Sequence, residues 1–332
     1  MLAEYRIAVD VMGGDDAPGA IINGVKAALA EMDDIRIILC GPEEVVRPLE
    51  SSRISVVPTT EVIGMDESPM MAVRRKGDSS LVRAMLEVRE KRADAVVSAG
   101  STGAILAGGM FRIGRIKGVE RPALAPVLPG LRGPVLLLDV GANVDCQPKY
   151  LNQFGLMGSA YMNGVMGFDN PKVGLVNIGV EDEKGNKLAK EARLLMQEQT
   201  SYNFVGNVEA REIASGDYQV MVFDGFDGNL VLKHTEGLAS ALTGMLKEEL
   251  MSSMRTKIGA MIIKPALKRF KKRMDYHEQG GAPLLGIDGV VIKAHGSSNG
   301  RAICSAIRQA RTMIINDIVG KISAGLSGLA EE

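Results

Sequence analysis

Residues 6–15 read Arg6-Ile-Ala-Val-Asp-Val-Met-Gly-Gly-Asp15, a short apolar run that ends in Asp and Gly. The next segment, Ala17–Met32, has the apolar spacing of a helix. An apolar run, a small polar loop and a helix make up the repeating unit of a parallel α/β sheet. This unit recurs along the chain. The sequence therefore predicts a three-layer α/β/α protein built on a doubly wound, mostly parallel sheet.

Eight apolar runs of this kind are predicted strands. Because they are apolar along almost their whole length, we expect helices to cover both faces of the sheet. The predicted strands are Arg6–Asp10, Ile35–Cys40, Ile54–Val57, Ala95–Ser98, Val135–Asp139, Val173–Ile178, Gln219–Phe223 and Val290–Lys293. The predicted helices are Ala17–Met32, Ser79–Lys91, Thr102–Ile113, Lys149–Val165, Lys187–Gln199, Asn229–Ser252 and Ser298–Ile318.

The chain of 332 residues is long enough for one large or two modest domains. It contains no internal repeat and no low-complexity linker, so we predict a single large domain over residues 1–332. Two stretches interrupt the alternation of strands and helices. One is the Pro- and Gly-rich stretch Arg121–Pro134. The other, Met251–Met274, is rich in Met, Lys and Arg and predicts a helical excursion at about residues 251–275.

Composition and charge argue against a nucleic-acid partner. The chain has 39 Lys and Arg against 40 Asp and Glu, for a formal net charge of -1, so no global positive field would attract a polyanion. It has no Trp and only 4% aromatic residues, which leaves few platforms on which bases could stack. The hydrophobic content of 46% is that of an ordinary globular core.

Cysteine usage and the absence of apolar targeting segments predict a cytoplasmic protein without a metal centre. Cys40, Cys146 and Cys304 are widely separated, and no C-x-x-C pair is present that could hold zinc. Such usage is typical of a reducing compartment. The first ten residues lack the apolar run of a secretory signal, and no 18-residue uncharged apolar stretch occurs.

Loops rich in Gly and small polar residues follow six predicted strands, at the sheet edge where α/β proteins bind ligands. Glycine lets an anion approach backbone N–H groups, and the helix start that follows adds partial positive charge. No Walker A or G-x-G-x-x-G motif follows any of these strands, so the anion need not be a nucleotide. Taken alone, each loop is explained equally well as a tight turn or a helix cap. The loops are Asp10–Asp15, Ser98–Gly103, Asp139–Asp145, Asn177–Gly179, Asp224–Asn229 and Lys293–Ser298.

Seven ordered motifs carry a family resemblance that runs from Arg6 to about Met313. They read IAVDVMGGDDAP, SAGSTGA, GRIKGVERPALAPVLP, LLDVGANVDCQP, NIGVEDEKGN, VFDGFDGNLVLK and GGAPLLGIDGVVIKAHGSS. Together they resemble the bacterial phosphate acyltransferase family PlsX, of phospholipid synthesis. Ser101 stands where that family usually has Asn, and its hydroxyl can still donate a hydrogen bond.

The resemblance implies reversible transfer of a long-chain fatty acyl group from acyl-[acyl-carrier-protein] to inorganic phosphate, with no cofactor and no metal. It implies a sheet like those of phosphotransacetylases and isopropylmalate-type dehydrogenases, and a homodimer. It also implies peripheral association with the inner face of the cell membrane, where a membrane glycerol-3-phosphate acyltransferase takes the acyl-phosphate. Three alternatives stay open: a phosphotransacetylase that uses acyl-CoA, a metal-dependent decarboxylating dehydrogenase, and a non-catalytic scaffold that binds lipid or carrier protein.

The resemblance also suggests roles for individual residues, which suit a reaction that depends on positioning and charge stabilisation. The expected catalytic residues are His295, Lys184, Asn229 and Lys233. The expected phosphate- or substrate-binding residues are Ser98, Gly100, Ser101, Thr102, Gly103, Asn143, Asp145, Ser297 and Ser298.

Each catalytic assignment has a structural alternative. Lys184 is equally well explained as a solvated loop lysine, and Asn229 as a helix cap followed by a surface lysine at position 233. His295 is a proton donor to the leaving thiolate, a partner of the oxyanion, or a histidine buried beside a strand end. Cys146 invites an acyl-enzyme hypothesis that the family motif does not require. The other two histidines, at 234 and 277, are expected to be structural or on the surface.

The excursion carries eight basic residues and no acidic residue between Arg255 and Arg273. Its apolar residues follow helical spacing, and Pro265 predicts a break between two helical pieces. A basic amphipathic helix pair suits an anionic membrane surface, an acidic carrier protein or a dimer interface, and the sequence leaves all three open. The residues expected to make membrane or carrier-protein contact are Arg255, Lys257, Ile258, Met261, Ile262, Lys264, Lys268, Arg269 and Phe270.

Overall fold

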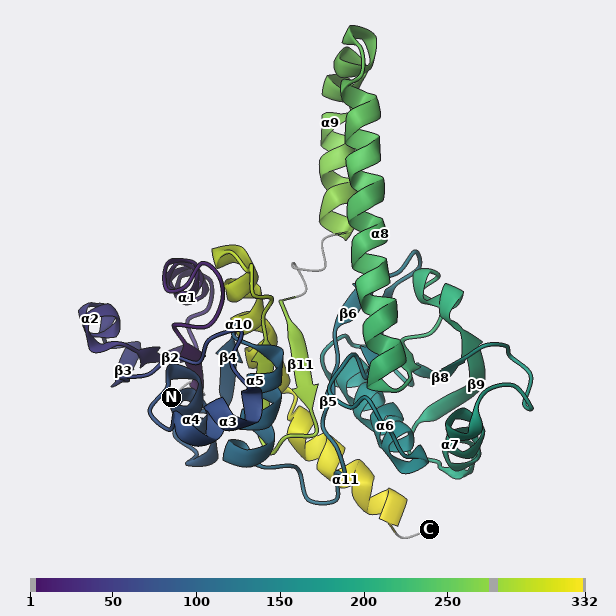
Figure 1. The fold of residues 1–332 in the computed structure, drawn as a ribbon, viewed down its shortest axis with the longest axis horizontal. Coiled ribbons are helices and arrows are strands. Elements are labelled where there is room, and N and C mark those ends of the chain that lie inside the picture. The colour runs from purple at the N-terminus through teal and green to yellow at the C-terminus, as the bar shows by residue number, and fades with distance from the viewer. Residues whose placement is uncertain (1–3, 275–279, 331–332) are drawn as a thin grey trace.

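The computed structural model describes residues 4–274 and 280–330 and contains two β-sheets flanked by helices (Figure 1). The first sheet has seven strands in the order β3-β2-β1-β4-β12-β11-β5, and the second has five in the order β6-β7-β10-β8-β9. Most neighbouring strands are parallel; β11 runs antiparallel to both its neighbours, and β6 runs antiparallel to β7. The α/β class and the predominance of parallel pairing are confirmed.

The first sheet consists of β1 (Tyr5–Asp10), β2 (Ile35–Gly41), β3 (Ile54–Pro58), β4 (Ala95–Ser98), β5 (Ala123–Leu124), β11 (Ala282–Leu285) and β12 (Val290–Lys293). The second consists of β6 (Val127–Pro129), β7 (Pro134–Leu138), β8 (Lys172–Asn177), β9 (Asn203–Glu209) and β10 (Val220–Val222). The helices are α1 (Gly19–Glu31), α2 (Glu43–Val46), α3 (Pro69–Arg75), α4 (Ser80–Arg89), α5 (Thr102–Gly108), α6 (Pro148–Gly164), α7 (Lys187–Glu198), α8 (Gly225–Met251), α9 (Met254–Met274), α10 (Gly300–Ile315) and α11 (Ile318–Ala330).

The sequence analysis placed all strands in one sheet, whereas the structure divides them between two. The chain passes from the first sheet to the second between Ala125 and Pro126, whose backbone groups hydrogen bond to different sheets. The Ala125 backbone N–H donates to the Pro283 carbonyl oxygen (3.0 Å), whereas the Pro126 carbonyl accepts from the Leu137 N–H (3.0 Å). The strands on either side, β5 and β6, have only two and three residues, too few to show a strand pattern in a Pro- and Gly-rich segment.

Helices cover both faces of the first sheet, as the apolar strands predict. In β1, Ile7 and Val9 belong to a buried cluster that includes residues of α1 and α10. Ala8, which points to the opposite face, packs with residues of α4. The first of these clusters continues into the second sheet, where it includes Phe154 of α6. The two sheets therefore share one hydrophobic core.

A helical hairpin formed by α8 and α9 projects from the body of the molecule (Figure 1). The predicted break at Pro265 is wrong, because α9 continues through this residue as one helix. A proline inside a helix lacks the N–H of one backbone hydrogen bond, and packing against α8 supports α9 despite this loss. The side chains of 271–274, including Lys271, Lys272 and Arg273, and all of His277 lie outside the part that the structure describes. Among the described helices, none combines the length and apolar character that crossing a membrane requires.

Close packing of α1 against α10 generates a stability prediction at Gly24. A Cβ at this position would lie 2.5 Å from the Ile303 Cβ and 2.8 Å from the Gly300 carbonyl oxygen. We expect Gly24→Ala to lower the free energy of unfolding by about 1–3 kcal/mol, because the added methyl forces the two helices apart. Gly19→Ala is the matched control, since a Cβ there meets nothing within 4 Å. Urea denaturation measures both, and equal stability of the two variants would contradict the packing argument.

Candidate active site

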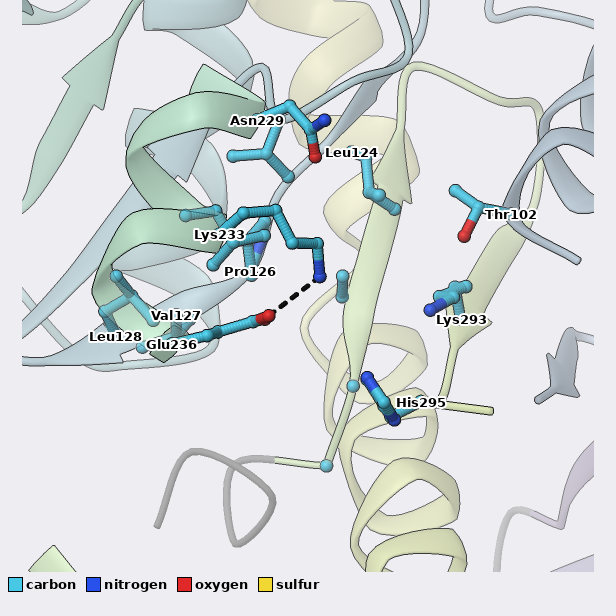
Figure 2. Close-up of a pocket in the computed structure, with 15 residues that line it drawn as sticks. Thr102, Leu124, Pro126, Val127, Leu128, Asn229, Lys233, Glu236, Lys293 and His295 are labelled. Carbon is cyan, nitrogen blue, oxygen red and sulfur yellow. Dashed lines mark hydrogen bonds and ion pairs between the residues drawn. The ribbon is translucent and has the colours of Figure 1, made fainter. Parts of the chain in front are cut away.

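A cavity of about 130 Å³ lies where the chain passes between the two sheets (Figure 2). Thr102, Lys293 and His295 reach it from the first sheet and the loops that follow its strands. Helix α8 contributes the opposite wall. The remaining lining comes from residues 124–128, from Val140 after β7, and from residues 280–282 at the start of β11. The full lining is Thr102, Leu124, Pro126, Val127, Leu128, Val140, Asn229, Leu232, Lys233, Glu236, Gly280, Gly281, Ala282, Lys293 and His295.

The first turns of α8 present a polar face to this cavity. Asp224 caps the helix by accepting a hydrogen bond from the Asp227 backbone N–H (2.8 Å), so the interpretation of Asn229 as the cap is wrong. Asn229, Lys233 and Glu236 are spaced i, i+4 and i+7, which places them on one side of a helix. All three line the cavity.

A buried carboxylate, Asp139, fixes the start of α8 and the first crossing segment relative to each other. Its Oδ1 accepts hydrogen bonds from the backbone N–H groups of Leu124 (2.9 Å) and Ala142 (3.2 Å). Its Oδ2 accepts from the backbone N–H (2.6 Å) and side-chain amide (3.0 Å) of Asn143. A Cβ at Gly225 of α8 would lie 2.7 Å from Oδ2, so the helix start packs directly on this carboxylate.

Burial raises the pKa of Asp139 to about 6, and the hydrogen bonds from Leu124, Ala142 and Asn143 act in the opposite direction. All four hydrogen bonds are donated to the carboxylate oxygens, so they stabilise the ionised form. The amide of Asn143 is also used in this network, because its second hydrogen bond goes to the Pro122 carbonyl (2.8 Å). Asn143 thus supports the wall of the cavity and does not line it.

A second buried carboxylate, Asp10, organises the loops on the first-sheet side. The Ser98 hydroxyl donates to Asp10 Oδ2 (2.6 Å) and accepts from the Gly100 N–H (3.0 Å). Asp10 Oδ1 accepts from the Met12 N–H (3.2 Å), and burial raises the pKa of this carboxyl. A Cβ at Gly13 would lie 2.7 Å from the Gly100 nitrogen, so the two loops need glycine to approach so closely.

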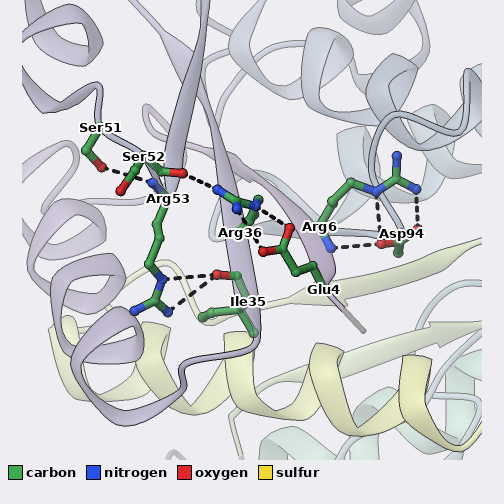
Figure 3. Close-up of polar contacts among 8 residues, drawn as sticks. All are labelled: Glu4, Arg6, Ile35, Arg36, Ser51, Ser52, Arg53 and Asp94. Atoms are coloured by element: carbon green, nitrogen blue, oxygen red, sulfur yellow. Dashed lines mark hydrogen bonds and ion pairs between the residues drawn. The ribbon is translucent and has the colours of Figure 1, made fainter. Parts of the chain in front are cut away.

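Ion pairs and hydrogen bonds at the opposite edge hold the strands in place (Figure 3). The Arg6 guanidinium binds both carboxylate oxygens of Asp94, with Nη2 2.7 Å from Oδ1 and Nε 3.3 Å from Oδ2, and so joins the starts of β1 and β4. Arg36, at the start of β2, pairs with Glu4 (Nη2 to Oε1, 2.7 Å). The Arg53 Nε, just before β3, donates to the Ile35 carbonyl (3.4 Å). Ion pairs and hydrogen bonds of arginine side chains thus fix the amino ends of these strands, and the loops rich in Gly and small polar residues follow the carboxyl ends.

His295 is oriented by its own loop. Its Nδ1 accepts from the Ser297 backbone N–H (3.2 Å) and lies 2.9 Å from the Ser297 hydroxyl. Because Nδ1 acts as an acceptor, the neutral ring carries its proton on Nε2. The backbone N–H of Asp15 donates to the Gly296 carbonyl (2.8 Å), which joins this loop to the one after β1.

The charged groups that line the cavity carry an excess of positive charge. Lys233 Nζ lies 2.7 Å from Glu236 Oε2. Lys293 has no such close carboxylate partner among the described residues, and burial, followed by the charge of Lys233, lowers the pKa of its ammonium group. Two lysines therefore face one carboxylate. A bound anion would stabilise the protonated form of Lys293.

The structure brings four of the predicted site residues together on the cavity: Thr102, Asn229, Lys233 and His295. Those that flank the cavity or support its loops are Ser98, Gly100, Ser101, Gly103, Asn143, Ser297 and Ser298. Lys184 and Asp145 are exposed and do not line it. The Asn177 side-chain amide donates a hydrogen bond to the Lys184 backbone carbonyl (3.1 Å). The Lys184 side chain itself is exposed, as the solvated-loop alternative expects.

The sequence analysis did not assign Lys293 or Glu236 to the site. Lys293 ends a buried strand two residues before His295, and Glu236 continues the i, i+4, i+7 pattern that starts at Asn229. Both signals were present in the sequence. Burial raises the pKa of the Cys146 thiol to about 12, which keeps it protonated and disfavours the acyl-enzyme alternative. Among the residues described, no three His, Cys, Asp or Glu side chains are grouped as a metal site would require.

Comparisons with known proteins show the family to which the chain belongs. A family model described as "Fatty acid synthesis protein" matches residues 5–321. The chain is 51% identical to a "Putative phosphate acyltransferase" of Clostridium perfringens over 324 residues, covering 96% of each protein. It is 52% identical to a "Phosphate acyltransferase" of Geobacillus thermodenitrificans over 324 residues, covering 97% of this chain and 98% of that protein.

The fold resembles those of solved phosphotransacetylases. EutD phosphotransacetylase from Staphylococcus aureus superposes with a TM-score of 0.61 at 17% identity, covering 94% of both chains. A phosphotransacetylase from Streptococcus pyogenes gives 0.60 at 16% identity, again covering 94% of both. The fold and site thus define a two-sheet α/β protein with a cationic cavity at the sheet crossing. The chain belongs to the fatty acid synthesis protein family, also known as PlsX, and it is an acyltransferase.

The role of Asp139 generates a second prediction. Asp139→Asn replaces one acceptor oxygen with an NH₂ group that faces N–H donors. We expect a loss of about 1–3 kcal/mol in the free energy of unfolding, together with a loss of activity, because buried donors are left unpaired at the start of α8. Asp145→Asn, on the same loop but exposed, should change stability by less than about 0.5 kcal/mol. Equal denaturation midpoints for the two variants would contradict the positioning role.

Proposed function

We propose that the protein transfers a long-chain fatty acyl group from acyl-[acyl carrier protein] to inorganic phosphate, forming acyl-phosphate for phospholipid synthesis. The observation that carries the proposal is the pair of lysines, Lys233 and Lys293, facing one carboxylate in a cavity with partly apolar walls. Phosphate would supply the negative charge that this group of side chains lacks. The names of the relatives, phosphate acyltransferases, support the same substrate.

The reaction forms one C–O bond and breaks one C–S bond. A phosphate oxygen attacks the thioester carbonyl carbon, and the tetrahedral oxyanion collapses with departure of the thiolate. The proton lost from hydrogen phosphate balances the proton gained by the sulfur, so the products are acyl-phosphate and the free thiol. Hydrogen phosphate is already anionic and a thiol of pKa about 8.5 leaves readily, so the protein needs mainly to hold and polarise the reactants.

In this scheme Lys233 and Lys293 hold the phosphate, and the Thr102 hydroxyl adds a donor from the opposite wall. The Asn229 amide donates to the developing oxyanion. A donor of this kind contributes about 100- to 1000-fold in kcat in comparable acyl-transfer sites. His295 gives its Nε2 proton to the departing sulfur and takes up the proton that hydrogen phosphate loses, so the ring is neutral before and after the step.

His295 variants test this assignment. We expect His295→Ala to lower kcat by about 100-fold or more, while affinity for the acyl donor changes by less than about 3-fold. His295→Asn keeps an N–H donor but cannot transfer a proton, so it should restore little activity. Full recovery by the asparagine would show that the ring acts only as a hydrogen-bond donor, and wild-type turnover of the alanine variant would remove His295 from the mechanism.

The donor and the acceptor are tested together by thiol release from palmitoyl-acyl carrier protein, measured with and without inorganic phosphate. The same assay with palmitoyl-CoA is the control. Phosphate-dependent release from the carrier protein supports the proposal. Release from CoA alone would favour a phosphotransacetylase-type donor, and binding of the carrier protein without release would favour a scaffold.

We also propose that the α8–α9 hairpin connects the enzyme to its partners. Along α8, Leu238, Leu242 and Met245 are exposed at helical spacing, a face that suits a second copy of the chain. Sedimentation equilibrium tests this homodimer, and a monomer mass would contradict it. The tip, where Met254 is 76% exposed beside Arg255 and Lys257, suits an anionic membrane on the inner side of the cell.

From this position the enzyme would pass acyl-phosphate to a membrane glycerol-3-phosphate acyltransferase. The remaining basic and apolar residues of α9 would contact the membrane or the acidic carrier protein. They are Ile258, Met261, Ile262, Lys264, Lys268, Arg269 and Phe270.

Charge reversal at the tip provides the corresponding prediction. We expect Arg255→Glu with Lys257→Glu to weaken binding to phosphatidylglycerol vesicles by at least about 10-fold, because each basic residue near an anionic surface contributes about 1 kcal/mol. Turnover in solution should persist. Lys187→Glu with Lys190→Glu, exposed on α7, makes the same change in charge away from the hairpin. If both double variants bind vesicles equally in a flotation assay, the tip is not the membrane contact.

A further inference from the structure

A second, larger cavity lies against the same helix as the candidate active site. It is a groove of about 580 Å³ between α8 and the single helical turn at Ala210–Ala214. Its volume lies within the range of small-molecule sites in proteins. We propose that this groove holds the hydrocarbon tail of the acyl group during transfer, an inference that rests on the function proposed above.

The groove and the candidate active site share one wall, which the hydrocarbon tail would have to cross. Leu128 and Glu236 line both cavities. Figure 2 shows these two side chains together with Val127 on one side of the site, away from Thr102 and Lys293. Around α8, Asn229 and Lys233 face the site, whereas the groove is lined by the neighbouring positions Leu230, Val231, His234, Thr235 and Ala239. A ligand with its carbonyl beside the lysines can therefore extend into the groove around one helix.

The surface of the groove is suited to a hydrocarbon. Its apolar lining includes Leu128, Pro129, Ile213, Leu230 and Val231. Three of its four polar side chains already have partners within the protein. The Thr235 hydroxyl donates to the Val231 carbonyl (2.8 Å), Glu236 pairs with Lys233, and Arg211 Nη2 lies 2.6 Å from Glu209 Oε2. The groove thus offers apolar contact to a ligand and little unsatisfied polar surface.

Three alanines, at 210, 214 and 239, keep the groove open. A larger side chain at one of these positions would occupy the space of several methylenes. Each buried methylene strengthens binding about four-fold, so loss of the groove should weaken long-chain donors steeply and leave short-chain donors almost unchanged. This dependence on chain length distinguishes a tail site from a general structural role.

The experiment compares hexadecanoyl- and hexanoyl-acyl carrier protein as donors for Ala239→Phe and Ala214→Leu. These substitutions enter the groove from α8 and from the opposite wall, so one remains informative if the other fails to fold. We expect the KM for the hexadecanoyl donor to rise by about 10-fold or more, with less than a 2-fold change for the hexanoyl donor. Ala241→Phe, exposed on α8 and outside the groove lining, is the matched control.

Equal effects on both donors, or no effect on either, would overturn the proposal. A loss of dimer mass without selectivity for chain length would also overturn it, because the groove would then be covered by a second copy of the chain. If the wild-type protein shows no phosphate-dependent thiol release, the proposed function fails on its own. Binding of the fluorescent fatty acid cis-parinaric acid then tests the groove: weaker binding by Ala239→Phe than by Ala241→Phe supports a tail site, and equal binding contradicts it.

Discussion

The hydrogen bonding of one buried carboxylate, Asp139, sets the geometry on which the rest of the structure depends. The carboxylate ties the short strand β5, which belongs to the first sheet, to the loop that follows β7 of the second. The start of α8 packs on the same group through Gly225. Since α8 carries Asn229, Lys233 and Glu236, this contact decides which side chains face Lys293 and His295 across the cavity. A carboxylate buried between two sheets costs free energy unless its oxygens accept hydrogen bonds. The donors to Asp139 come from β5 and from the loop after β7, which help to form the walls of the site.

Charge in the cavity follows from that arrangement. Glu236 pairs with Lys233 at 2.7 Å, while Lys293 is half-buried and has its pKa lowered by burial and by the charge of Lys233. The protein thus holds an ammonium group in an environment that an anion would make more favourable. The adjoining groove is largely apolar, so a charged and an apolar surface meet at Leu128 and Glu236. An acyl-phosphate likewise combines a charged phosphate and an apolar hydrocarbon chain, which its carbonyl group connects.

Much of the fold could be predicted because the buried parallel strands are apolar and end in Gly and Asp. Ala95–Ser98 and Val290–Lys293 have the predicted bounds. The division into two sheets could not be predicted. It depends on the hydrogen bonds of the Ala125 and Pro126 backbone groups, and β5 and β6 are too short for a periodic pattern. In the site, the family resemblance suggested Thr102, Asn229, Lys233 and His295, whose places at strand ends and on one helix face suited that assignment. Lys293 was missed because a lysine that ends a strand is usually exposed, and only the fold shows that this one is half-buried and lines the cavity.

The most direct test of the account is a crystal structure of the protein soaked with inorganic phosphate. We expect a phosphate in the cavity between the sheets, with oxygens about 2.7–3.2 Å from the Nζ atoms of Lys233 and Lys293. Phosphate bound instead at the exposed turn that carries Lys184, with the cavity left without an anion, would show that the sheet crossing does not form the acceptor site.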